Sequence, residues 1–414
     1  MRVPAAALAL CALAASGAVA GSGLGKKARF QHTMEIFDGH VCVFGGKSTS
    51  VGTRLADFLT DYRCVDATRS IDQGDPVWRH QSSASRFVMP PLAQHTSVYN
   101  RANHIIVPYG GQAPSTFSKA NQLAIFCTLY QAWGASNAVD SAPRRYLHTA
   151  VLQESSGDML IFGGTTDDTT FKGDGSRYNK VSRLITDNVR HAAHSKSLGH
   201  GSASNIAVGT VLTDDGDETP QPITNLVQHA SVMINDTLMV VLGGNVYDGT
   251  LPVGEQNVMR PFSTVYVYDV DKMSWSTRNC TGSVPPSRGV IAVAQRDEYI
   301  YIHGGVNVNK WDELYADLYE LNTLTWTWKK MATPGSPVPR YAHQMKALGH
   351  YLIITHGFIS KDLGNGTTIG TGDPDIYFYN LRHKAFVDTY SPKGISKAEL
   401  DKEWTVARTG ATDG

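Results

Sequence analysis

Three histidines that lie close together are the first candidates for chemistry in this 414-residue sequence. They are His191, His194 and His200, and the first two belong to the run HAAH. On a helix, two imidazoles at positions i and i+3 can share a metal ion. No carboxylate or cysteine stands at a suitable third position, so we interpret the segment as a solvated loop and expect no metal site.

The acidic run from Asp214 to Glu218 resembles a calcium-binding loop only in composition. It lacks the twelve-residue spacing and the closing glutamate of an EF-hand. The sequence also has no G-x-S-x-G elbow, no phosphate-binding glycine loop and no H-E-x-x-H motif. We therefore name no catalytic residue and no cofactor, and the sequence favours a protein that is not an enzyme.

Composition and charge narrow the class of protein. Hydrophobic residues make up 42% of the chain and charged residues 18%, which is typical of a folded protein. Lys and Arg together number 37, and so do Asp and Glu. Without a net charge there is no long-range field to attract a polyanion, which argues against nucleic acid as the partner.

The first twenty residues predict export from the cell. Arg2 precedes the small apolar run Ala5 to Ala15, and Ala18 and Ala20 form an A-x-A cleavage pattern, so we interpret residues 1–20 as a signal peptide. No later run is apolar enough to span a bilayer, and the C-terminus has no lipid-anchor signal. We expect a secreted protein, extracellular or at the cell surface. Three N-x-[ST] tripeptides are candidate glycosylation sites: Asn235, Asn279 and Asn365.

A phrase of hydrophobic residues that ends in two glycines recurs along the chain. It reads VCVFGG, IIVPYGG, MLIFGG, LMVVLGG and YIYIHGG, with a sixth copy YLIITHG in which His356 replaces the first glycine. A marker residue stands 13 to 15 positions before the first residue of each glycine pair: His32, His95, His148, His229, Ile291 and His343. This constant spacing predicts a strand, a tight turn and a second strand.

An aromatic strand and then a Trp or Phe follow each glycine phrase, except in the third repeat, whose outer strands are hard to place. This pattern resembles the kelch repeat family and the related central domain of galactose oxidase. The resemblance covers residues 28–390 and implies an all-β fold, a six-bladed kelch-type β-propeller with four antiparallel strands per blade. Residues 391–414 would form a C-terminal tail. We expect the ring to close by packing of the first blade against the sixth, and the marker histidines to hold carbonyls within their own blade.

The resemblance to galactose oxidase also raises the possibility of copper. That family implies a Tyr-His dipeptide among its ligands, and no such dipeptide occurs in this chain. We therefore expect no copper site.

Cysteines suit an oxidising compartment. Cys42, Cys64, Cys127 and Cys280 remain after the signal peptide and allow up to two disulfides in three connectivities. Cys42 lies in the predicted second strand of the first blade and Cys64 in its third strand. Because these strands are neighbours, we predict a Cys42–Cys64 disulfide.

Loop length gathers on one predicted face of the propeller. The connections between second and third strands are long, and they carry four aromatic residues that we predict to bind a ligand: Trp311, Tyr247, Phe117 and Phe358. The expected function is a monomeric extracellular module that binds a protein or a glycan. Two alternatives stay open, namely a secreted carbohydrate-active enzyme or oxidase, and a structural component of a cell wall or matrix.

Overall fold

The computed structural model describes residues 27–49, 56–80, 89–114, 124–129, 131–135, 145–165, 182–185, 211–212, 223–248, 250–252, 255–362 and 368–395. These residues form strands and turns, with no helix among them, so the prediction of an all-β fold is confirmed. In this part of the chain no helix is long and apolar enough to cross a membrane. Residues 1–20, which we predict to be a signal peptide, lie outside the described residues.

Six sheets, numbered here in chain order, account for most of the strands. Sheet 1 consists of β1 (Thr33–Phe37), β2 (His40–Phe44), β5 (Tyr62–Asp66) and β7 (Arg79–His80). Sheet 2 consists of β8 (Thr96–Asn100), β9 (Ile105–Tyr109), β10 (Ala124–Cys127) and β11 (Ala132–Ala135). Sheet 3 consists of β12 (Thr149–Gln153), β13 (Asp158–Phe162), β14 (Ser182–Ile185) and β15 (Val211–Leu212). Sheet 4 consists of β17 (Ala230–Ile234), β18 (Leu238–Leu242), β21 (Thr264–Asp269) and β22 (Ser274–Asn279). Sheet 5 contains β24 (Ala292–Arg296), β25 (Tyr299–His303), β28 (Leu318–Asn322) and β29 (Thr327–Lys330). Sheet 6 consists of β31 (Gln344–Leu348), β32 (Tyr351–Thr355), β35 (Ile376–Asn380) and β36 (Ala385–Val387). A two-residue strand, β23 (Thr281–Gly282), adds to the edge of sheet 5 in parallel with β29.

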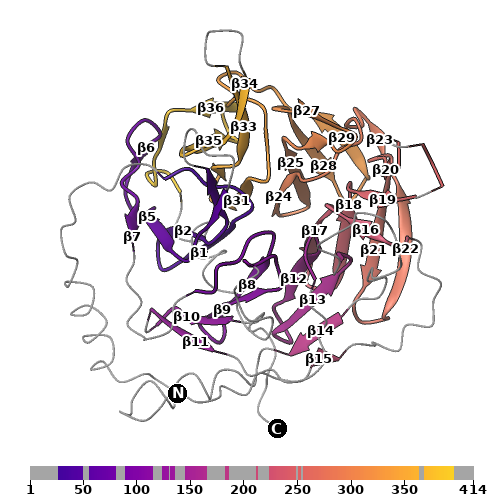
Figure 1. The fold of residues 1–414 in the computed structure, drawn as a ribbon, viewed down its shortest axis with the longest axis horizontal. Helices are drawn as coiled ribbons and strands as arrows, with labels where there is room; N and C mark the ends of the chain where they lie inside the picture. Colours follow the sequence, from indigo (N-terminus) through magenta and orange to yellow (C-terminus); the bar gives the residue numbers. More distant parts are fainter. Residues whose placement is uncertain are drawn as a thin grey trace.

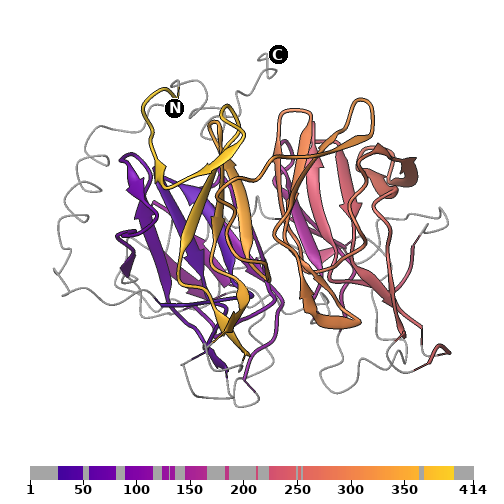
Figure 2. The ribbon, with the colours of Figure 1, turned by 90° about the horizontal axis from the view of Figure 1, so that it is seen from above.

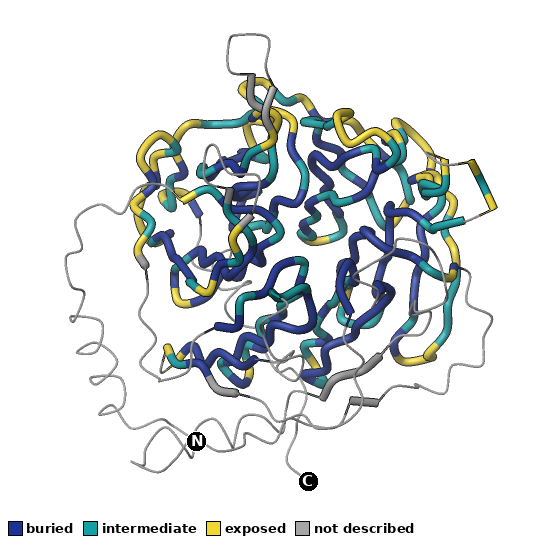
Figure 3. The backbone as a smooth tube through the Cα atoms, viewed as in Figure 1, coloured by how far each residue is buried: buried dark blue, intermediate teal, exposed yellow. Residues whose placement is uncertain are grey.

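The sheets are arranged around a central space, with the first strand of each sheet innermost (Figure 1). Each first strand lies beside the first strands of two neighbouring sheets, and β31 of sheet 6 lies beside β1 of sheet 1. Seen from the side, the strands run between two faces of the molecule (Figure 2). Burial is greatest within the sheets, and exposed residues gather at the outer rim (Figure 3).

Short accessory strands extend one of these faces. Four connections between second and third strands form hairpins: β3 (Lys47–Thr49) with β4 (Ala56–Phe58), β19 (Asn245–Tyr247) with β20 (Asn257–Met259), β26 (Val306–Asn307) with β27 (Lys310–Leu314), and β33 (Phe358–Asp362) with β34 (Thr368–Gly372). Two further strands pair with these hairpins, β16 (Leu226–Val227) and β30 (Arg340–Tyr341). We call this end of the sheets the hairpin face and the opposite end, with the turns between first and second strands, the turn face.

Aromatic side chains of the outermost strands fill the wedges between sheets. Trp133 of sheet 2 lies 6.0 Å from Phe44 of sheet 1 between ring centroids, and Trp275 of sheet 4 lies 4.7 Å from Phe162 of sheet 3. Large aromatic rings provide much buried apolar area, which is the main source of stability for neighbouring sheets that share no strand.

A disulfide joins Cys42 to Cys64 in the pairing that the sequence predicts. The two residues face each other across the β2–β5 ladder, with Cα atoms 4.1 Å apart. Cys127 is buried in β10 of sheet 2, and Cys280 is buried directly after β22 of sheet 4.

The last described residues return to the first sheet. Strand β37 (Thr389–Tyr390) pairs with β6 (Ile71–Asp72), and the Tyr390 hydroxyl donates to the carbonyl of Ala67 at 3.1 Å. Tyr390 is fully buried, and it shares one core cluster with Ile395 and with residues of sheets 1 and 6. The predicted tail therefore begins with residues that pack into the protein.

Candidate binding face and central cavity

The glycine phrases leave room for side chains of the next sheet. Gly163 has φ +68°, and a Cβ atom there would lie 2.6 Å from the His229 ring and 2.7 Å from the Leu226 carbonyl oxygen. A real side chain would overlap both groups, so only glycine fits between sheets 3 and 4. The repeated glycine thus marks a close contact between successive sheets.

Marker histidines bind the preceding sheet, not their own. The His95 Nε2 atom lies 3.1 Å from the Thr33 hydroxyl, and the same pairing recurs as Thr96 with His148, Thr149 with His229, and Thr355 with His32. Our expectation that these histidines hold carbonyls within their own blade is therefore wrong. Burial lowers the pKa of His95 and of His229 to about 3, so both rings are neutral at pH 7.

Backbone hydrogen bonds link all six sheets in a cycle. The N–H of the last residue of each glycine phrase donates to the carbonyl of the residue three positions before the next marker: Gly46 to Leu92, Gly111 to Arg145, Gly164 to Leu226, Gly244 to Arg288, Gly305 to Arg340 and Gly357 to Arg29. The last of these, 3.0 Å long, joins sheet 6 to sheet 1. A second bond, from the Gln31 N–H to the Ala342 carbonyl at 2.9 Å, joins the same two sheets.

Buried arginines form a repeat that our reading of the sequence missed. They lie three residues before four of the markers: Arg29, Arg145, Arg288 and Arg340. Arg340 donates to the His356 carbonyl at 2.7 Å and forms an ion pair with Asp373 at 2.5 Å. Arg29 is held in the same way by the Gly45 carbonyl and Asp61. The signal is visible in RFQH, RYLH, RGVI and RYAH, and these arginines fix the base of the hairpin face.

Aromatic side chains form a row on this face across sheets 5, 6 and 1. Trp311 of β27 is 48% exposed and lies 5.5 Å from Tyr341, which lies 5.1 Å from Phe358. Phe358 in turn lies 5.1 Å from Phe30. The structure thus brings two of our predicted binding residues together through Tyr341, which we had read only as part of a repeat marker. We call Trp311, Tyr341, Phe358 and Phe30 the aromatic row.

Two other predicted binding residues lie elsewhere. Tyr247 belongs to β19 in the hairpin of sheet 4, is half-buried, and its hydroxyl donates to Gln256 at 3.2 Å. Phe117 lies outside the described residues.

Within the aromatic row, burial raises the pKa of Tyr341 to about 12, so its hydroxyl stays protonated at neutral pH.

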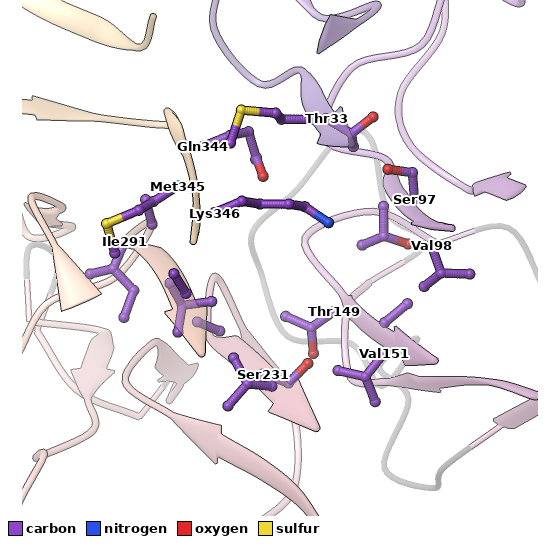
Figure 4. A pocket seen from close by; sticks show the side chains of 18 of the residues that line it. Thr33, Ser97, Val98, Thr149, Val151, Ser231, Ile291, Gln344, Met345 and Lys346 are labelled. Carbon is purple, nitrogen blue, oxygen red and sulfur yellow. The ribbon is translucent and has the colours of Figure 1, made fainter. Parts of the chain in front are cut away.

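A cavity of about 590 Å³ runs along the innermost strands of all six sheets. Trp311 and Tyr341 line its hairpin-face end, and Arg101, Glu154 and Gln295 line its turn-face end. The side chains of Lys346 and Gln344 extend into its middle (Figure 4). This volume lies within the range of small-molecule sites, about 300–1,000 Å³.

The described residues contain no group of three His, Cys, Asp or Glu side chains that could hold a metal ion. His191, His194 and His200, and the candidate glycosylation site Asn365, lie outside the described residues. The other two candidate glycosylation sites, Asn235 and Asn279, are exposed. The aromatic row and the central cavity offer ring stacking, apolar contact and hydrogen bonds, which are means of ligand recognition.

Comparisons with known proteins agree with the repeat. A family model described as the KLHDC2/KLHL20/DRC7 Kelch-repeats domain matches residues 94–357. Kelch domain-containing protein 3 of Homo sapiens is 29% identical over 130 residues, which are 31% of this chain and 31% of that protein. Acyl-CoA-binding domain-containing protein 5 of Arabidopsis thaliana is 26% identical over 293 residues, which are 68% of this chain and 39% of that protein. The chain thus spans less than half the length of both relatives.

Proposed function

Because the chain belongs to the kelch-repeat domain family, we propose that it is an interaction module that docks a partner protein on the aromatic row. The observation that carries the proposal is the position of Trp311, which is 48% exposed and rests against Tyr341. Exposed aromatic residues that are held by their neighbours are typical anchors of protein interfaces. The row behind Trp311 supports its ring from one side and leaves the other side for a partner.

The scaffold of this module is proposed to be a closed propeller of six blades, one for each sheet. The cycle of hydrogen bonds from second glycines to the next sheet supports closure, as does the contact of β31 with β1. A closed ring protects the inner strand edges and gives the hairpin face a rigid base. Such a base favours binding because little order has to be gained when a partner docks.

The partner is proposed to be an extracellular protein, with a glycan as the second candidate ligand. Export rests on the A-x-A pattern at Ala18 and Ala20 and on the Cys42–Cys64 disulfide, a bond that persists in oxidising compartments. Attached glycans are proposed at Asn235, Asn279 and Asn365. Asn279 is exposed at the end of β22, the outermost strand of sheet 4, whereas Trp311 lines the central cavity, so a glycan on Asn279 would be attached at the rim and not beside the central cavity.

The test is a comparison of Trp311→Ala with Leu324→Ala. Leu324 is 74% exposed in sheet 5, whose β26–β27 hairpin carries Trp311, but it lies in the turn between β28 and β29 on the turn face. A partner would first be identified by crosslinking to the secreted chain, and its affinity would then be measured for both variants. We expect Trp311→Ala to weaken binding at least tenfold, which corresponds to ~1.4 kcal/mol or more, and Leu324→Ala to leave it unchanged.

Equal binding by Trp311→Ala and the wild-type chain would refute the anchor, and loss of binding in Leu324→Ala would refute the choice of face. Binding of the same strength to an isolated glycan on an array would replace the protein partner with a glycan. Circular dichroism and melting curves of both variants provide the control for folding, because neither side chain is buried.

A further inference from the structure

We propose that the central cavity binds an uncharged polyol, of about the size of a six-carbon sugar alcohol or inositol, against Gln344 and Lys346. This site lies deeper than the aromatic row and does not depend on the proposed docking of a protein. The argument rests on the charge balance of the cavity, on the fixed position of Lys346 and on the distribution of polar and apolar walls.

The charges that line the cavity balance. Its lining contains two carboxylates, Glu35 and Glu154, and two cations, Arg101 and Lys346. Burial lowers the pKa of the lining marker histidines, so they add no charge at pH 7. A ligand with a net charge would leave water without gaining a matching countercharge, and this cost favours a neutral ligand.

Lys346 is held in one position by groups from other sheets. Its Nζ atom lies 2.6 Å from Oε2 of Glu35, whose other oxygen accepts a hydrogen bond from the Ser97 hydroxyl at 2.6 Å. Glu35 is buried, whereas the Lys346 side chain is 38% exposed. An ammonium group has three N–H donors, and Glu35 uses one of them. The remaining donors are available to an oxygen acceptor in the cavity.

Gln344 extends this polar wall. It lies two residues before Lys346 on β31, and the two side chains therefore point to the same side of the strand. Figure 4 shows both in the cavity. Gln344 is half-buried, and its side-chain amide offers both donors and an acceptor. A hydroxyl group, which donates and accepts, can satisfy Gln344 and Lys346 alike.

Apolar side chains line other parts of the same cavity. Val98, Val151 and Ile291 come from three different sheets and face the same space as Lys346 (Figure 4). C–H groups of a polyol can contact these walls while its hydroxyl groups reach the polar strand. A ligand with hydroxyls on several carbons fits this pattern better than an ion, which needs polar atoms on all sides, or a hydrocarbon, which would leave Gln344 without a partner.

The experiment measures saturable binding of myo-inositol, sorbitol and glucose to the full secreted chain by calorimetry and ligand-observed NMR. Gluconate and glucosamine serve as charged counterparts, and we expect them to bind at least tenfold more weakly than the best neutral polyol. Gln344→Ala and Lys346→Met should each weaken that polyol at least tenfold. Lys329→Met, at an exposed position of β29, is the matched control and should leave binding unchanged.

Loss of Lys346 alone leaves Glu35 buried without its countercharge and could unfold the chain. The double variant Glu35→Gln with Lys346→Met removes both charges and should fold, yet it should still lose the polyol. The proposal is overturned if none of the neutral polyols binds, so that the cavity holds water only. It is also overturned if gluconate or glucosamine binds as tightly as the best neutral polyol. The same holds if the double variant or Gln344→Ala binds that polyol as tightly as the wild-type chain.

Discussion

Replacement of Tyr390 tests whether strand β37 helps to join sheet 6 to sheet 1. Its fully buried ring lies 4.9 Å from the Tyr351 ring and 5.7 Å from the Phe378 ring in sheet 6, while its hydroxyl donates to the carbonyl of Ala67, just after β5 of sheet 1. Removal of a buried aromatic side chain costs about 3–5 kcal/mol. We therefore expect Tyr390→Ala to lower the free energy of unfolding by about 4 kcal/mol.

Tyr390→Phe separates the hydroxyl from the ring. It keeps the packing and leaves the Ala67 carbonyl without its donor, for an expected loss of about 1–2 kcal/mol. Denaturant titrations followed by tryptophan fluorescence would give both values. Because a larger protein has a larger unfolding entropy, 4 kcal/mol corresponds to a fall in Tm of only about 5 °C.

Hydrogen exchange shows where the damage falls. Tyr390→Ala should speed amide exchange in sheets 1 and 6, and sheets 3 and 4 should exchange as before. Tyr379→Ala is the matched control, since Tyr379 is equally buried but its hydroxyl binds Ala332, between sheets 5 and 6. A loss below about 1 kcal/mol in Tyr390→Ala, or exchange that rises equally in all sheets, would refute a role in closure.

Two further predictions concern the contacts between sheets. His95 and His229 have a pKa of about 3 in the folded protein, below the ordinary histidine value of about 6.5. Their contribution to the free energy of unfolding is therefore complete above pH 6.5 and is lost as the pH falls toward 3. Denaturant titrations from pH 7 to pH 4 should show a slope that His95→Gln reduces by up to about 1.4 kcal/mol per pH unit, and an unchanged slope would contradict the neutral buried ring. Gly163→Ala should lower the free energy of unfolding by more than about 2 kcal/mol, because its Cβ would overlap His229 and Leu226. Gly74→Ala is the control and should lower it by less than about 0.5 kcal/mol, since Gly74 is exposed and has no positive φ. Similar losses in the two variants would show that the close contact at Gly163 is not required.

The sequence was most informative about contacts within one repeat. Thr33 pairs with Phe44 and Thr149 with Phe162, so marker and glycines lie at the same end of each hairpin. The spacing between them varies only with the length of the turn, which holds two residues between Phe37 and His40 and four between Gln153 and Asp158. A regular ladder leaves no other freedom, and for this reason the spacing alone predicted the hairpins.

The spacing of residues within one repeat could not predict the contacts between different repeats. The partner of His95 is Thr33, 62 residues away, and no local period connects them. The recurrent Thr after three of the markers was a usable signal that we did not apply. The aromatic row was missed in part because Tyr341 occupies a repeat position, and its contact with Trp311 depends on how two neighbouring hairpins stand beside each other.

The outer strands of the third sheet were also out of reach. Strands β14 and β15 lie at Ser182–Ile185 and Val211–Leu212, and the segment has no tryptophan to mark them. Without an aromatic anchor, a short strand in a long connection has no pattern that separates it from its surroundings.

The bonds that join sheet 6 to sheet 1 bear on the order of folding. His32 and Thr355 are 323 positions apart, and bringing together the ends of so long a segment costs about 5 kcal/mol in chain entropy. Each of the six sheets, by contrast, takes its four meander strands from one continuous stretch of chain. The sheets can therefore fold one after another during translation, as each stretch of chain leaves the ribosome. The junction between the last sheet and the first can form only after sheet 6 has been synthesised, and until then the apolar side of sheet 1 that packs against sheet 6 is exposed to chaperones.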